Sequence, residues 1–126
     1  MELLTAWTDA EDIGLELLAA AGAPTVLFTP VDLVPPLTVV RCIGGTDDRV
    51  TNIARIQVQS YGSTRVQARD LAENSRQIVL AAAATSVAGT SLDQTRTEQS
   101  PSFVDYGQPG IHRYIAVYRL EYRRTF

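Results

Sequence analysis

Few residues in this chain of 126 could do acid–base or nucleophilic chemistry. His112 is the only histidine and Cys42 the only cysteine, and the Gly-x-Ser-x-Gly motif that marks one class of serine nucleophile is absent. His112 opens a predicted strand and is interpreted as a surface or turn residue. Cys42 lies in an apolar run, which favours a buried structural thiol over a nucleophile. The sequence therefore predicts no enzymatic activity.

Metal and phosphate sites have equally little support in the sequence. One histidine and one cysteine cannot make a typical zinc site. Asp47 and Asp48 are adjacent carboxylates without further oxygen ligands nearby, which is a weak pattern for a divalent cation. Gly44 and Gly45 lack the Lys-Ser/Thr that follows the glycines of a P-loop, so they are predicted to form a turn after a strand. We expect no metal and no cofactor.

The composition is that of one ordinary globular domain, which we expect to span residues 1–126. Apolar residues make up 45% of the chain and charged residues 20%. The longest apolar run, residues 78–84, is too short to cross a membrane. The N-terminus is acidic where a secretory signal would be basic, so a cytoplasmic product with no membrane association is expected.

Charge is distributed unevenly along the chain. Residues 1–48 hold eight acidic and one basic side chain, whereas residues 49–126 hold six acidic and ten basic ones. Every basic residue of the chain is an arginine. Two interpretations remain open: the charges mix over a solvated surface, or an acidic face meets a basic face of a neighbouring copy. No basic run or basic stripe with interleaved aromatic residues is present, which argues against sequence-specific nucleic-acid binding.

The hydrophobic periodicity predicts two helices and four strands. A helix is expected from a Thr8-x-x-Glu11 capping box to about Ala21, and another from a Thr64-x-x-Gln67 box to residues 81–84. Residues 25–36 are predicted to be a structured loop with a short β-prone start, because prolines exclude a helix there. The expected strands are residues 37–43, 53–61, 90–98 and 112–123, the third being an edge strand.

This order predicts an α/β (α+β) fold, with a four-stranded, mainly antiparallel sheet and two helices packed on one face. The helix residues Leu71, Ile78 and Val79 are expected to pack on the sheet residues Ile56, Val58, Tyr114 and Tyr118. The last strand also carries Ile115 and Val117 on its outer face. That pattern fits a central strand, or an outer face that another subunit partly covers.

A recognisable arrangement of strands and turns covers most of the chain. The residues that carry it are Val39-Val40-Arg41-Cys42-Ile43-Gly44-Gly45, then Ile53-Ala54-Arg55-Ile56-Gln57-Val58-Gln59-Ser60-Tyr61-Gly62, then Ser63-Thr64-Arg65 with Ala68, Leu71 and Ala72, and finally Arg113-Tyr114-Ile115-Ala116-Val117-Tyr118-Arg119-Leu120. This arrangement resembles the tail terminator proteins of long-tailed, non-contractile bacteriophages.

The resemblance implies a structural virion protein of the tail and neck region, assembled in the host cytoplasm and without catalytic residues. Such a protein forms a homo-hexameric ring that caps the tail tube and stops its polymerisation. The implied partners are the tail tube protein and the head-connector (stopper or neck) protein, with DNA only passing through the lumen. The alternatives are another head–tail connector (head-completion) protein, a small non-catalytic adaptor module, or an enzyme with an unrecognised site near His112 or Cys42.

Two long loops are the expected places of contact with partners. Residues 44–52 carry Asp47, Asp48 and Arg49 on a glycine-primed tip, which is expected to line the lumen or to meet the tube. Residues 98–110 carry an apolar set expected to be buried between subunits or against the tube. Ile115 and Val117 are expected to add to that contact. The members of the apolar set are Phe103, Val104 and Tyr106.

Overall fold

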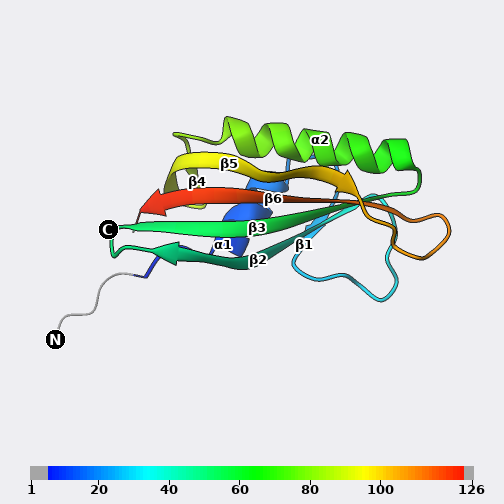
Figure 1. Ribbon diagram of the computed structural model, residues 1–126, viewed down its shortest axis with the longest axis horizontal. Helices are drawn as coiled ribbons and strands as arrows, with labels where there is room; N and C mark the ends of the chain where they lie inside the picture. Colours follow the sequence, from blue (N-terminus) through cyan, green and yellow to red (C-terminus); the bar gives the residue numbers. More distant parts are fainter. Residues whose placement is uncertain (1–5, 124–126) are drawn as a thin grey trace.

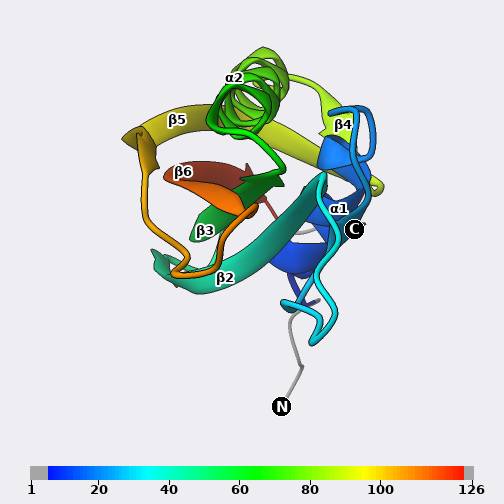
Figure 2. The same cartoon turned by 90° about the vertical axis from the view of Figure 1, so that its right-hand side faces the viewer.

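One mixed sheet and two helices make up the fold of residues 6–123, the part of the chain that the computed structural model describes. In chain order the elements are α1 (Ala10–Leu18), β1 (Thr25–Val26), β2 (Leu37–Asp47), β3 (Thr51–Gly62), α2 (Arg65–Ala81), β4 (Ser86–Val87), β5 (Thr90–Phe103) and β6 (His112–Arg123). The sheet order is β1-β2-β3-β6-β5-β4. Only β1 pairs in parallel, with β2. The sheet curls strongly into a half-barrel (Figure 1 and Figure 2).

The predicted α+β class is confirmed, and the last strand takes the central position that was one of the two interpretations of its apolar outer face, but the sheet has six strands instead of four. The two additional strands, β1 and β4, have two residues each. Each forms where the chain passes beside a strand that other contacts already hold in place, as Thr25 does beside Thr38. β1 falls at the β-prone start predicted for residues 25–36, but two residues are too few to show a hydrophobic period, so sequence patterning predicted neither as a strand of the sheet.

Three strands run further than predicted, β3 by one or two residues at each end and β2 and β5 by more, and the loops beside them shrink. β2 continues past Gly44 and Gly45 to Asp47, with a register shift between Cys42 and Gly44. The prediction that these glycines form a turn is therefore wrong, because they sit at a bulge within a strand. β5 continues through Pro101, which is tolerated because β4 pairs only with Thr90 and Ser91 and leaves the rest of β5 at the edge of the sheet, as predicted for this strand. The connections that remain are residues 48–50 and 104–111.

The helix starts are set by side chains that accept backbone hydrogen bonds. Thr64 caps α2 as predicted, its Oγ1 accepting from the Gln67 N–H at 3.1 Å. At α1 the cap is Asp9, which accepts from the Glu11 N–H at 2.8 Å, so the prediction of Thr8 as the cap is wrong by one residue. Neither helix within residues 6–123 is long and apolar enough to cross a bilayer.

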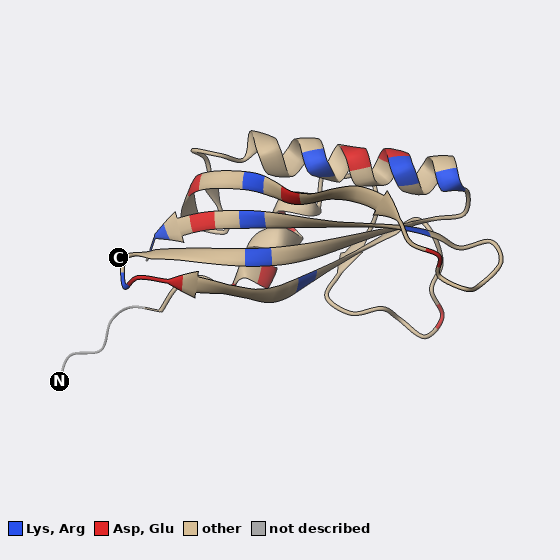
Figure 3. Ribbon diagram, viewed as in Figure 1, with Lys and Arg blue, Asp and Glu red and all other residues tan. Residues whose placement is uncertain are grey.

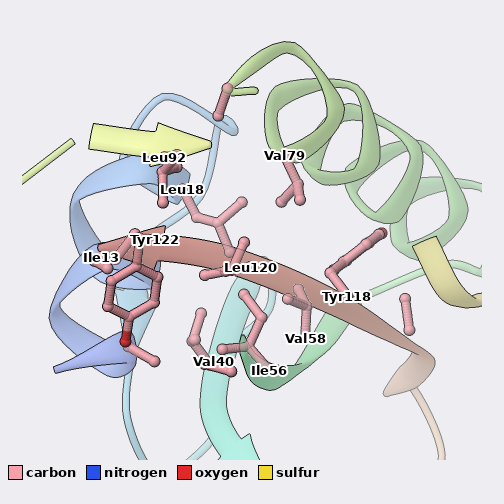
Figure 4. Close-up of a cluster of buried hydrophobic side chains, with 14 residues drawn as sticks. Ile13, Leu18, Val40, Ile56, Val58, Val79, Leu92, Tyr118, Leu120 and Tyr122 are labelled. Carbon is pink, nitrogen blue, oxygen red and sulfur yellow. The ribbon is translucent and has the colours of Figure 1, made fainter. Parts of the chain in front are cut away.

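Both helices cover the same face of the sheet, as predicted, and close the main core over it. Val79 of α2 packs in one cluster with Ile56, Val58 and Tyr118, all fully or almost fully buried (Figure 4). α1 adds further side chains to this cluster, among them Ile13 and Leu18. The predicted core is correct for this group, whereas Ile78 and Tyr114 are only half-buried and Leu71 is buried outside the cluster.

A second, smaller core lies on the opposite face of the sheet. Val39 and Tyr61 form its base, and Ile111 packs on them. Tyr106 meets the Tyr61 ring edge-on, with 5.4 Å between the ring centroids. Leu33 from the β1–β2 connection adds to this core from a second loop. The connections of residues 27–36 and 104–111 therefore meet at one end of the sheet, while the β2–β3 turn lies at the other end (Figure 1).

Candidate interaction surfaces

The structure separates the two residues that could have formed a nucleophile–base pair. β3 lies between the strands that carry them: its residue Gly62 pairs with His112 and its residue Ile56 pairs with Cys42. Six residues of strand put the two side chains on the order of 20 Å apart. Among residues 6–123, no three His, Cys, Asp or Glu side chains gather closely enough to hold a metal ion.

Cys42 is exposed, so the prediction of a buried thiol is wrong. The outer half of β2, residues 41–47, extends past the short strand β1 and is exposed along its whole length. An apolar run therefore indicates a strand but not whether the body of the protein covers it. Glu11 of α1 satisfies one backbone group on this free edge, since its Oε2 accepts from the Cys42 N–H at 3.0 Å.

The acidic tip is a tight turn, and one of its carboxylates shapes it. Oδ1 of Asp48 accepts hydrogen bonds from the N–H groups of Val50 (3.1 Å) and Thr51 (2.8 Å). These backbone donors hold the pKa of Asp48 below its usual value, because they favour the charged form. Arg49 takes a positive φ of 89° in the turn. Asp47 ends β2 and is exposed. A role for Asp47, Asp48 and Arg49 in the lumen or on the tube stays a prediction.

The apolar residues predicted for the second loop fall into two groups. Phe103 ends β5 and stays exposed, with its ring under the Arg65 guanidinium (4.2 Å to the ring centroid) and 5.8 Å from the Tyr114 ring. Tyr106 is half-buried in the second core, and Val104 is half-buried beside it in the chain. A contact of Phe103, Val104 and Tyr106 with another subunit stays a prediction. Of these three residues, Phe103 has the side chain that is exposed to solvent.

The outer face of β6 is covered more fully by this chain than the sequence indicated. Val117 is buried within the single subunit and Ile115 is half-buried. In the register, Val117 lies between Gln57 of β3 and Gln99 of β5, so it is a central-strand residue between two long neighbours. The burial of Val117 is therefore accounted for within the subunit, while a contact of Ile115 and Val117 with a neighbouring subunit or the tube stays a prediction.

The most exposed apolar surface lies in a segment that the sequence analysis described only as a loop. Residues 27–36 present Phe28 (71% exposed), Val31 (101%) and Val34 (74%) to solvent. Prolines at positions 30, 35 and 36 exclude helix and hinder strand formation, so no element of the subunit buries these side chains. Apolar residues recurring in a proline-rich connection were the signal that could have identified this surface.

The fold is shared with a protein of a virus-like particle. A scan against known protein families finds no match, and no curated protein is significantly similar in sequence. Among solved structures, the chain matches a chain of the "Virion of native gene transfer agent (GTA) particle". The match has a TM-score of 0.57 and 12% identity, and it covers 92% of this chain and 87% of that chain. The likeness extends over nearly the whole of both chains, so it describes the complete fold.

Proposed function

We propose that this protein is a structural component of a phage-like particle, and more specifically that it caps the tail tube as a ring. The observation that carries the proposal is the fold shared, over 92% of the chain, with a chain of a gene transfer agent virion. Fold alone does not define function, so the surfaces of the subunit have to support the same conclusion.

The surfaces fit a protein that works by contact. Exposed apolar side chains at Phe28, Val31 and Val34 are costly on a free monomer and typical of a surface that a partner covers. The candidate chemical groups, His112 and Cys42, lie far apart on separate strands. These surfaces therefore support a role in assembly rather than in catalysis.

The two ends of the sheet suit two different partners. The 12-residue strand β3 spans roughly 40 Å. One end carries the β2–β3 turn with Asp47 and Asp48, and the other carries the apolar residues of the segment 27–36 (Figure 1). A subunit of a cap must present one surface to the tube and another to the head connector. In our proposal these two ends face those two partners, within a homo-hexameric ring through which DNA passes.

The test is removal of this gene from a genome that produces the particles, followed by electron microscopy of the tails. Loss of a cap leaves tube polymerisation unchecked, so the expected result is tubes of variable and excessive length without heads. Supplying the intact gene should restore a single length. Tails of normal length that fail to join filled heads would instead support a head-completion role. Unchanged particles would overturn the proposal altogether.

A further inference from the structure

Three arginines stand side by side across the outer face of the sheet. Arg119 of β6 is directly opposite Arg55 of β3 on one side and Arg96 of β5 on the other. Their neighbours in sequence, such as Ile56 and Leu120, are buried on the helix side, so the arginines face outward. Figure 3 shows this row as a basic band that crosses β5, β6 and β3, with a further basic position on β2.

Residues directly opposite on adjacent strands have Cβ atoms about 5 Å apart, and like charges at such positions destabilise a sheet. One carboxylate offsets part of this charge: Nε of Arg55 lies 2.9 Å from both carboxylate oxygens of Glu98. The hydrogen bond from Arg55, and then the charges of Arg55 and Arg119, hold the pKa of Glu98 below its usual value. With the Gln94 amide assigned from its partners, its oxygen accepts from Arg96 at 3.1 Å.

The row nevertheless keeps an excess of positive charge. Within residues 6–123, Arg119 donates no hydrogen bond, and Gln94 brings no charge to Arg96. Guanidinium groups have planar pairs of donors that match carboxylates. The row is therefore suited to a partner that presents several carboxylates.

Such a surface exists on the opposite side of the same subunit. Between Asp9 and the end of α1 the chain holds four acidic and no basic residues. Asp9, Asp12 and Glu16 are exposed, while Ile13 and Leu18 turn into the core beneath the sheet. The acidic helix and the arginine row thus lie on opposite faces of the sheet and are free to contact two different neighbours.

We propose that the arginine row of one copy binds the acidic face of α1 in the next copy. This inference rests on the proposed ring, and it identifies the contact between ring subunits. Contacts between two different faces join subunits head to tail, which closes into a ring when the rotation allows it. A second copy fits better than nucleic acid, because the chain carries a net charge of −3 and Glu98 and Glu121 flank the row.

The test is reversal of charge on one face at a time. The double variant Arg96→Glu/Arg119→Glu makes the row acidic, and Asp12→Arg/Glu16→Arg makes the helix face basic. Sedimentation velocity is measured at about 0.05 M and 0.5 M salt, up to the highest soluble concentration. The wild type is expected to associate, at least tenfold more weakly at high salt. Each variant alone is expected to stay monomeric.

An equimolar mixture of the two variants supplies the decisive result. Each reversed face then meets a reversed face of opposite sign, so association is expected to return to within a few-fold of the wild-type strength. The control is Arg69→Glu/Arg76→Glu on α2, which changes net charge equally on the helix side of the sheet, away from the row, and should associate like the wild type. Circular dichroism checks that every variant is folded.

Several results would overturn the inference. They are a wild type that stays monomeric at every concentration, single-face variants that associate normally, a mixture that fails to associate, or duplex DNA binding by the wild type that the sheet variant loses. Tail length in particles separates this inference from the proposed function. If particles made with either variant have capped tails of normal length, the arginine–α1 contact is ruled out, whereas the proposed function as a cap still stands.

Discussion

The hydroxyl of Tyr122 donates a hydrogen bond to the carbonyl oxygen of Thr8, 2.9 Å away. The same hydroxyl accepts from the Asn52 side-chain amide at 2.9 Å. One phenol thus joins the segment before α1, the start of β3 and the end of β6. The acidic helix and the β2–β3 hairpin are held to the same strand by this side chain.

Tyr122→Phe is expected to lower the free energy of unfolding by about 1–3 kcal/mol, since two polar groups lose their partner in a partly buried place. Urea unfolding followed by circular dichroism measures the change. Tyr118→Phe is the matched control, because the Tyr118 hydroxyl is buried without a hydrogen bond among the described residues. Its removal should change stability by less than about 1 kcal/mol. Equal losses in both variants would contradict the assignment.

The glycine pair in β2 offers a second test. Gly45 has a φ of +152°, and a Cβ there would lie 2.1 Å from the carbonyl oxygen of Ile53. Gly45→Ala is expected to cost more than about 1 kcal/mol and to disorder the outer half of the hairpin. Gly44 has a φ of +131° with open space around it, so Gly44→Ala carries backbone strain alone and should cost less. Nuclear magnetic resonance shifts of the hairpin amides distinguish the two outcomes.

Periodicity and capping predicted the elements that depend on local sequence. β6 carries an apolar residue at every second position from Tyr114 to Tyr122, and its bounds of His112 and Arg123 agree with the prediction. The start of α2 followed from the hydrogen bond that Thr64 can offer to Gln67. Both features depend on neighbouring residues, which is why the sequence reveals them.

The features that the sequence could not reveal depend on contacts between distant residues. Cys42 was predicted to be buried, but exposure is decided by where β1 stops covering β2, which no local pattern encodes. The arginine row joins positions 55, 96 and 119 through strand register alone. In the loop 27–36, the sequence shows that residue 31 is an apolar valine, but it does not show that the fold leaves Val31 uncovered.

Alkaline pH should unfold the protein through its buried tyrosines. Burial raises the pKa of Tyr118 well above the ordinary value near 10, and burial also raises that of Tyr122. The neutral phenols therefore stabilise the fold below pH 10, and this contribution is lost as the pH rises above 10 toward the folded-state pKa values. Absorbance at 295 nm should show these two phenols ionising only together with the loss of circular dichroism.

Tyr118→Phe supplies the control for that titration. With one fewer buried phenol to ionise, the alkaline unfolding midpoint should move to higher pH. A midpoint that does not move, or ionisation of every tyrosine near pH 10 in a fully folded protein, would contradict the role given to Tyr118.

The exposed loop residue Val31 tests the contact surface directly. Val31→Asp should leave the free energy of unfolding of the subunit within about 0.5 kcal/mol, because the side chain is fully exposed. It should nevertheless reduce the fraction of tails with the normal length, since a charge would be buried against the partner. Val66→Asp on α2 is the matched control, since Val66 is also an exposed valine (55% exposed) and lies on another surface. Equal effects of both substitutions would show that the loop has no special role.

The last prediction concerns backbone protection at the two ends of the sheet. Hydrogen exchange is measured on the free protein and on assembled tails. At one end, the β2 amides of residues 41–47 that point away from β3 lie on a free strand edge, and at the other end residues 27–36 and 104–111 lie in connections, so these amides should exchange fast in the free protein. In assembled tails both sets should gain protection, because the tube and the head connector cover opposite ends.

The buried centre of β3 provides the internal reference for this experiment. Amides at Ile56 and Val58 should be protected in both samples, since the main core holds them without any partner. Protection gained at only one end would assign that end to the tube or the connector and leave the other end free in the particle. Unchanged fast exchange at both ends would exclude these surfaces from the assembly and contradict the arrangement proposed for the cap.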